Sequence, residues 1–174
     1  TNKAEYLGKT ILFATGTKVK KLDIPGAKQF ENKGVNFCAL CDAPLYKNKV
    51  VAVIGGSDTA CREALILAEH VKKAYIIYRR ENIHPEEATL RLLEKSGKVE
   101  VITNTNLTEI KGENKVNKVL LDRKYKGSNE LNLDGVSCRA EISEKENGMD
   151  IKVFGDEKCK SVLTKTLRER GFDI

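Results

Sequence analysis

Two cysteines stand at C-x-x-C spacing, Cys38 and Cys41, and an acidic residue, Asp42, follows them directly. This spacing lets the two sulfur atoms close a small ring, and it often lowers the pKa of a thiol into the range where its thiolate reacts. One thiolate attacks a partner and the other resolves the mixed disulfide. The carboxyl group of Asp42 can act as a general acid or base for the neighbouring thiolate. The pattern predicts a redox-active dithiol with Cys38, Cys41 and Asp42 as catalytic residues.

A zinc half-site and an inert pair are the other interpretations of these cysteines. A zinc site needs a second close pair or a nearby histidine, whereas Cys61, Cys138 and Cys159 are isolated in the sequence. An odd number of cysteines with one close pair is not typical of a secreted disulfide framework, and it favours a reducing compartment. We therefore expect no metal site and a cytoplasmic protein.

A strand-helix-strand unit is predicted after the cysteine segment. Val50–Ile54 is a continuous apolar run, rich in β-branched residues, of the kind buried on both faces of a parallel sheet. The run stops at Gly55-Gly56, and a helix with one apolar stripe is predicted over residues 58–70. A second strand, residues 74–78, ends at Arg79-Arg80. With a right-handed crossover, these pieces form a βαβ unit.

The turn of this unit approximates the dinucleotide fingerprint G-x-G-x-x-G/A. Gly55 and Ala60 occupy its first and third positions, and Ser57 replaces its second glycine. The helix N-terminus that follows offers free N–H groups and the positive end of a helix dipole to a phosphate. The turn predicts a cofactor site made by Gly55, Gly56, Ser57, Asp58 and Thr59. A glycine pair can also form a tight turn in an α/β domain that binds no ligand.

Two arginines, Arg79 and Arg80, follow the second strand. An acidic residue at this place in a dinucleotide site binds the ribose hydroxyl of NADH, whereas a basic residue meets the 2′-phosphate of NADPH. A guanidinium group matches a phosphate with two parallel hydrogen bonds. The arginines therefore favour NADPH, and the alternative is a solvated strand end.

A short helix and a β-meander are predicted next. Pro85 at the first helical position and Gly97 beyond the last one delimit the helix. Strands are predicted over residues 99–103, 107–111 and 116–121, followed by a polar loop over 125–129 and a strand over 131–136. The predicted fold class is α/β, a Rossmann-like NAD(P)-binding domain with a parallel sheet plus a β-meander.

The composition excludes two classes of function. The 174 residues include 31 Lys plus Arg and 25 Asp plus Glu, for a formal net charge of +6. The lysines are dispersed among acidic residues and there is no Trp to stack on bases, so we expect no nucleic-acid partner. The apolar runs fall far short of the ~20 residues of a membrane span, so we expect no membrane association.

The ends of the chain predict incomplete neighbours of the central domain. Residues 10–14 form a short apolar run, and residues 151–154 open a new strand before Cys159 and a helix through Arg170. The second pattern resembles the start of a thioredoxin- or glutaredoxin-type module, which would be incomplete here. The first residue is Thr, so we expect an internal piece of a longer protein.

In this order, the features resemble the NADPH-binding domain of the thioredoxin reductase family of flavoproteins, over roughly residues 8–136. The resemblance rests on Ala14-Thr15-Gly16, Pro25-Gly26, Gly34-Val35, Cys38-x-x-Cys41-Asp42, Tyr46, residues 49–60, Glu63-Ala64, Tyr78-Arg79-Arg80 and Asp134-Gly135-Val136. It implies a connecting arm from a flanking FAD-type domain over 1–36 and an NADPH-binding domain over 37–136. Residues 137–174 would be a linker and a partial thioredoxin- or glutaredoxin-like segment.

The resemblance implies a disulfide oxidoreductase in which electrons pass from NADPH through FAD to the Cys38/Cys41 disulfide. From there they reach thioredoxin or a glutaredoxin-like protein. By the family's pattern Cys41 faces the flavin, Cys38 exchanges with the partner protein and Asp42 donates the proton.

Tyr78, Arg79 and Arg80 belong to the implied NADPH site, with the arginines on the 2′-phosphate. Ser57 and Tyr78 stand where the family usually has Gly and His, and Ala43 and His84 stand where it has Gly and Arg. The family's FAD-binding glycine motif is not visible. We therefore expect FAD to be bound by an FAD domain of the same enzyme, a homodimer in its full form, and turnover to need that domain.

Two other classes of function stay open. One is a flavin-free redox or NADP(H)-sensing binding module, in which the dithiol switches a partner interface. The other is a structural fragment with a degenerate nucleotide site.

Overall fold

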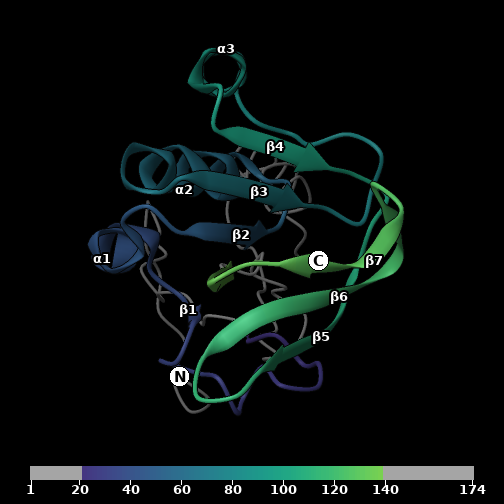
Figure 1. The fold of residues 1–174 in the computed structure, drawn as a ribbon. Coiled ribbons are helices and arrows are strands. Elements are labelled where there is room, and N and C mark those ends of the chain that lie inside the picture. Colours follow the sequence, from purple (N-terminus) through teal and green to yellow (C-terminus); the bar gives the residue numbers. More distant parts are fainter. Residues whose placement is uncertain (1–20, 139–174) are drawn as a thin grey trace, which may run out of the picture. The chain divides into compact units, whose positions relative to one another are not determined.

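The computed structural model describes residues 21–138 (Figure 1). The apolar run over 10–14 and the predicted C-terminal module, with Cys159, lie outside the described residues. Among the described residues, no helix has the length and apolar character needed to cross a membrane.

A parallel sheet forms the centre of this part of the chain, with its strands in the order β1-β8-β2-β3-β4. The strands are β1 (Val35–Asn36), β2 (Val50–Ile54), β3 (Lys73–Ile77), β4 (Val99–Ile102) and β8 (Gly135–Cys138). This arrangement confirms the predicted Rossmann-like fold class. β1 lies within the predicted connecting arm of residues 1–36, so the sheet takes its edge strand from that arm.

Helices cover one face of the sheet. They are α1 (Ala39–Asp42), the 3₁₀ helix η1 (Ala43–Tyr46), α2 (Asp58–His70) and α3 (Glu87–Ser96). α2 begins where the Ser57 side chain accepts a hydrogen bond from the backbone N–H of Ala60, as an N-cap residue does. Its predicted apolar stripe is buried, including Ala64 and Leu67.

The predicted β-meander is also confirmed, as an antiparallel sheet of order β5-β6-β7, whereas the strand predicted over 99–103 is β4 of the parallel sheet. Its strands are β5 (Leu107–Gly112), β6 (Val116–Tyr125) and β7 (Ser128–Asn132). The meander packs on the face of the parallel sheet opposite the helices (Figure 1).

Alternation along the central strands builds a separate core on each face, because successive strand residues point in opposite directions. Val51 and Val53 belong to the core under the helices, whereas Ala52 between them belongs to the core under the meander. Ile76 and Ile77 of β3 divide in the same way.

Three local predictions were wrong. The predicted strand over 131–136 is two strands in different sheets, because Leu133 N–H donates to Asn117 in the meander and Asp134 N–H donates to Val50 in the parallel sheet. The predicted polar loop over 125–129 is a two-residue hairpin turn, in which Lys126 and Gly127 have φ values of +49° and +91°.

The third error is the start of α3, which begins at Glu87 rather than at Pro85. Glu86 has an extended backbone with ψ of 151°, and its N–H donates to the side chain of Asp58. This tertiary contact keeps the backbone out of the helix at the position where sequence signals alone predict the first turn.

Candidate functional site

Two segments leave the parallel sheet at the carboxyl ends of their strands, and both were predicted to do chemistry. β1 leads into Cys38 and Cys41, and β2 leads into the glycine turn at Gly55. β8 lies between β1 and β2, so these two strands are roughly 10 Å apart. A single sheet therefore positions both segments. Open α/β folds bind their ligands at this edge of the sheet, beyond the carboxyl ends of the strands.

The cysteine pair is a disulfide with a Cα–Cα distance of 5.4 Å. Cys38 is the N-cap residue of α1, and its Sγ accepts a hydrogen bond of 3.3 Å from the backbone N–H of Cys41. Donation to a sulfur favours its thiolate form once the disulfide is opened. Cys41 is exposed and Cys38 is partly buried.

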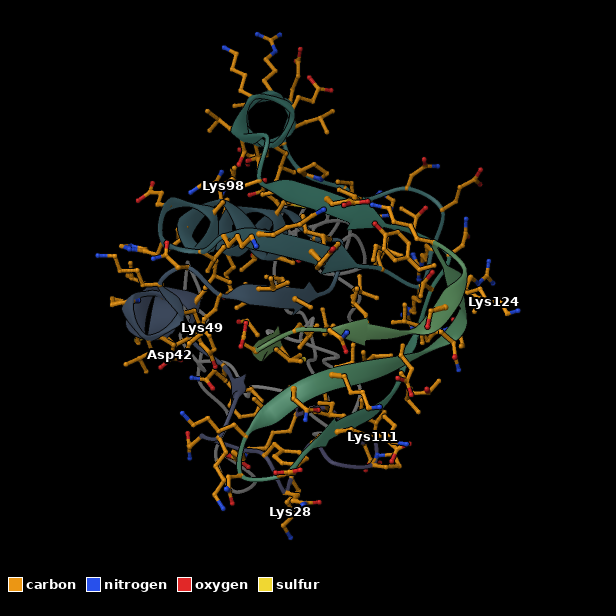
Figure 2. All side chains as sticks on the ribbon, viewed as in Figure 1. Lys28, Asp42, Lys49, Lys98, Lys111 and Lys124 are labelled. Carbon is orange, nitrogen blue, oxygen red and sulfur yellow. A yellow bond between two sulfur atoms is a disulfide. The ribbon has the colours of Figure 1, made fainter. Side chains whose placement is uncertain are left out.

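Asp42 and Tyr46 lie next to the disulfide. Asp42 is the last residue of α1 (Figure 2), and its charge is near enough to Tyr46 to affect that phenol. Burial, followed by the charges of Asp42 and Asp134, raises the pKa of Tyr46 to about 12, so the phenol keeps its proton. Its hydroxyl donates to Oδ1 of Asn36 over 3.2 Å, and this bond joins the residues before and after the disulfide helix.

Two leucines beside the disulfide are unusually exposed. Leu40 lies between the cysteines and is 73% exposed, and Leu45 in η1 is 65% exposed. The sequence analysis did not single out these leucines or Asn36, and it included Tyr46 only as part of the family resemblance. One signal for Leu40 was available in the sequence, because it is a large apolar residue inside a C-x-x-C motif that has to reach solvent.

The glycine turn follows β2 closely. Gly55 has a φ of +135°, in the region that favours glycine. A Cβ atom on Gly56 would lie 2.5 Å from the ring of Tyr78, so the close packing of that ring requires a glycine. Tyr78 is 5% exposed and also packs edge-on against the His84 ring. Its ring packs directly against the glycine turn.

The N-terminus of α2 is open to an anion. Ser57 caps Ala60, and its carbonyl accepts the N–H of Cys61. The N–H group of Thr59 has no hydrogen-bond partner among the described residues, and Thr59 is exposed, whereas Ser57 forms a parallel bridge with His84 beside it. Unpaired N–H groups at a helix start suit a pyrophosphate.

The side chain of Asp58, a predicted residue of the cofactor site, contacts other residues of the chain. Its Oδ1 accepts the backbone N–H of Glu86 at 2.9 Å, and its Oδ2 pairs with Arg62 Nε at 2.6 Å. The Glu86 N–H, with Thr89 and Arg62, lowers the pKa of Asp58. The carboxylate is thus directed at α3.

Arg79 and Arg80 lie at the end of β3 and are exposed. Their guanidinium groups form no ion pair or hydrogen bond with another residue of the described part of the chain. Two free cations after the second strand of the βαβ unit match the needs of a 2′-phosphate. The residues present therefore fit NADPH.

One strand-glycine-helix turn is present within residues 21–138, and FAD would need a turn of its own beside it. The described residues thus do not provide an FAD site in addition to the NADPH site. Within the same residues, no group of three His, Cys, Asp or Glu side chains could hold a metal ion.

Comparison with known proteins places the chain in a family. A family model described as pyridine nucleotide-disulphide oxidoreductase matches residues 1–163. The thioredoxin reductase of Spironucleus barkhanus is 42% identical over 111 residues, which are 64% of this chain and 36% of that protein. The thioredoxin reductase of Treponema pallidum is 38% identical over 137 residues, which are 78% of this chain and 45% of that protein.

The crystal structure of Lactococcus lactis thioredoxin reductase has a TM-score of 0.70 at 31% identity, covering 81% of this chain and 47% of that one. The chain thus spans less than half the length of these relatives. The family interpretation made from the sequence is confirmed: the chain belongs to the pyridine nucleotide-disulphide oxidoreductase family.

Proposed function

We propose that this chain is the NADPH-binding, dithiol-bearing domain of a flavoprotein that reduces the disulfide of a thioredoxin- or glutaredoxin-like protein. The observation that carries the proposal is one parallel sheet that presents both a Cys38–Cys41 disulfide and a glycine turn followed by two free arginines. The names of the relatives, which are thioredoxin reductases, support this substrate class.

The nucleotide site is assigned as follows. The N–H groups at the start of α2, with Gly55, Gly56, Ser57 and Thr59, hold the pyrophosphate of NADPH. Arg79 and Arg80 hold its 2′-phosphate with charge-assisted hydrogen bonds. Tyr78 supports the turn through its contact with Gly56. In the whole enzyme NADPH, together with an FAD held by a flanking domain, would supply the two electrons that reopen the disulfide.

The dithiol works by exchange. The Cys38 thiolate attacks one sulfur of the partner's disulfide, so that a bond to Cys38 forms and the partner's other sulfur leaves as a thiolate. Cys41 then attacks Cys38, closes the Cys38–Cys41 disulfide and releases the partner as a dithiol. Asp42 supplies a proton to a leaving thiolate. The hydrogen bond from Cys41 N–H to the Cys38 sulfur supports Cys38 as the attacking residue.

The proposal includes the wider assignments made from the sequence. These are a cytoplasmic location, a homodimer as the whole enzyme, and domain limits of 1–36, 37–136 and 137–174. The odd cysteine count supports the location.

Titration calorimetry of the chain with NADPH and NADH tests the nucleotide site. We expect NADPH to bind at least about tenfold more tightly than NADH, because two arginines meet the extra phosphate. Arg79→Glu should weaken NADPH by about 100-fold and NADH by less than about threefold, since charge reversal acts on the phosphate alone.

The matched control is Arg91→Glu, which reverses an exposed arginine on α3 that pairs with Glu87. It should leave both affinities unchanged. Equal losses of NADPH and NADH in Arg79→Glu would remove Arg79 from the phosphate site. Visible absorption of the longest native form of the protein then separates a flavoprotein from a flavin-free sensing module: a flavin band that bleaches with NADPH is expected.

A further inference from the structure

A loop of residues 79–86, here called the arginine loop, joins β3 to α3 and begins with the two free arginines. At its start, the backbone N–H of Asn104 donates to the Arg80 carbonyl at 2.9 Å. Toward its end, the His84 N–H donates to the Gly56 carbonyl at 2.6 Å. The arginine loop is therefore fastened to the nucleotide turn itself.

Asp58 makes the last of these attachments. Its carboxylate accepts the Glu86 N–H at 2.9 Å, where the arginine loop ends. Arg62 closes the arrangement, because its Nε pairs with Asp58 at 2.6 Å and its Nη2 pairs with Glu86 at 2.8 Å. The N-terminus of α2 and the N-terminus of α3 are thus joined through one carboxylate.

The same contacts direct the side chain of Asp58 away from the cofactor site. Its oxygens are directed at Glu86, Thr89 and Arg62, and a carboxylate would repel a pyrophosphate that approached it. Asp58 is the first residue of the helix at the nucleotide turn, and its side chain faces away from the ligand. It can therefore affect the ligand only through the segment that its carboxylate binds, which is the arginine loop with Arg79 and Arg80.

We propose that Asp58 is a positioning residue that sets the preference for NADPH over NADH, by fixing the arginine loop so that Arg79 and Arg80 meet the 2′-phosphate. The inference rests on the proposed function. It assigns to the Asp58 carboxylate an effect on the 2′-phosphate, which that carboxylate does not contact.

The test compares Asp58→Ala with Asp58→Asn, which keeps an oxygen that can accept the Glu86 N–H. Calorimetry of the chain should show that Asp58→Ala weakens NADPH by about tenfold and NADH by less than about twofold. Asp58→Asn should restore NADPH affinity to within about threefold of wild type. Amide hydrogen exchange without cofactor should show loss of protection at Glu86 in Asp58→Ala, and retention in Asp58→Asn.

The chain offers a matched control in Asp122, whose carboxylate accepts the backbone N–H of Asn106 at 3.0 Å within the meander. Asp122→Ala removes the same kind of bond and should leave the NADPH to NADH ratio unchanged. In a chain that already carries Arg79→Ala and Arg80→Ala, Asp58→Ala should cause no further loss of NADPH.

Four results would overturn the inference. Equal loss of both nucleotides in Asp58→Ala would show a shared contact or a general loss of structure. Unchanged NADPH affinity with lost protection at Glu86 would show that the loop's attachment does not matter. A further loss of NADPH in the arginine-free background would show an effect that bypasses the arginines. Absence of NADPH binding by wild type would overturn the proposed function, and this inference with it.

Discussion

The four cysteines of residues 21–138 are of two kinds, which differ in burial and in disulfide formation. Cys38 and Cys41 lie in a segment that reaches solvent and form a disulfide. Cys61 and Cys138 are buried free thiols. Burial, with a smaller effect of Asp58, raises the pKa of Cys61 to about 11, and burial, with a smaller effect of Glu63, does the same for Cys138.

We predict that native Cys61 and Cys138 resist alkylation. A thiol with a pKa of about 11 is ionised in roughly one molecule in 10³ at pH 8, and the thiolate is the reactive form. After mild reduction, peptide mass spectrometry should find iodoacetamide on Cys38 and Cys41 within minutes. Cys61 and Cys138 should be labelled after denaturant is added. Labelling of either buried thiol at the rate of Cys41 would contradict this.

At this scale the sequence predicts residue types better than residue roles. The dithiol, the glycines and the arginines could be identified because their chemistry depends on short spacings. The contact between the Asp58 carboxylate and the backbone of Glu86 could not be predicted, because Glu86 lies 28 positions later in the sequence. Tyr46 is part of the family resemblance, yet its hydrogen bond to Asn36 depends on the path of β1.

One carboxylate connects three elements at the outer end of the β-meander. Glu100 in β4 pairs with Lys73 of β3 and, at 2.6 Å, with Lys126 of the β6–β7 turn. The Tyr125 hydroxyl of β6 also donates to it. Hydrogen bonds from Lys126, Lys73 and Tyr125 lower the pKa of Glu100 to about 2.

We predict that this contact stabilises the fold near neutral pH and is lost in acid. A carboxyl group whose folded pKa is below its unfolded value of 4.5 contributes fully above pH 4.5, and its contribution falls as the pH drops toward 2. The side chain is 29% exposed, so we expect about 1 kcal/mol. Urea unfolding should show that Glu100→Gln lowers the free energy of unfolding at pH 7 and flattens its decline between pH 4.5 and 2.5.

Glu109→Gln is the control, because Glu109 pairs with Lys111 on the surface of the same meander. It should change the free energy of unfolding by less than about 0.5 kcal/mol at pH 7. A Glu109→Gln variant that matches Glu100→Gln would mean that any carboxylate of the meander has this effect.

Elements with a regular period were predictable, and junctions between sheets were not. The β-branched run of β2 and the apolar stripe of α2 follow from side-chain spacing alone. The passage from β7 to β8 was read as one strand because Leu131 and Leu133 continue an alternation of period two, although their hydrogen bonds go to the meander while Asp134 bonds to β2. An alternation of apolar residues predicts which side chains are buried, but it does not predict which sheet the strand joins.

The two candidate sites share a sheet yet have separate supports. The disulfide closes a ring inside α1, which is held from β1 by the bond between Tyr46 and Asn36. The glycine turn is held by β2, α2 and the arginine loop. The meander takes part in neither: its end at Lys124 lies on the opposite side of the domain from Asp42 (Figure 2).

We therefore predict that opening the disulfide leaves NADPH affinity unchanged within about twofold. Calorimetry of the chain before and after reduction by dithiothreitol measures this, with a Cys38→Ser and Cys41→Ser double variant as the control for the open state. A change of about tenfold or more would show that the disulfide and the nucleotide turn are coupled through α1 and α2.

The position of β8 has a consequence for how the molecule is made. Its residues pair with β1 on one side and β2 on the other, and they are the last described strand in the chain. During synthesis β2, α2 and β3 can associate early because they are consecutive, whereas β1 has no partner strand until Gly135–Cys138 has emerged. Closing so long a loop is a slow step of folding. The segment that carries the dithiol therefore stays unpaired in the nascent chain longer than any other part of the sheet. Its cysteines are exposed during that time.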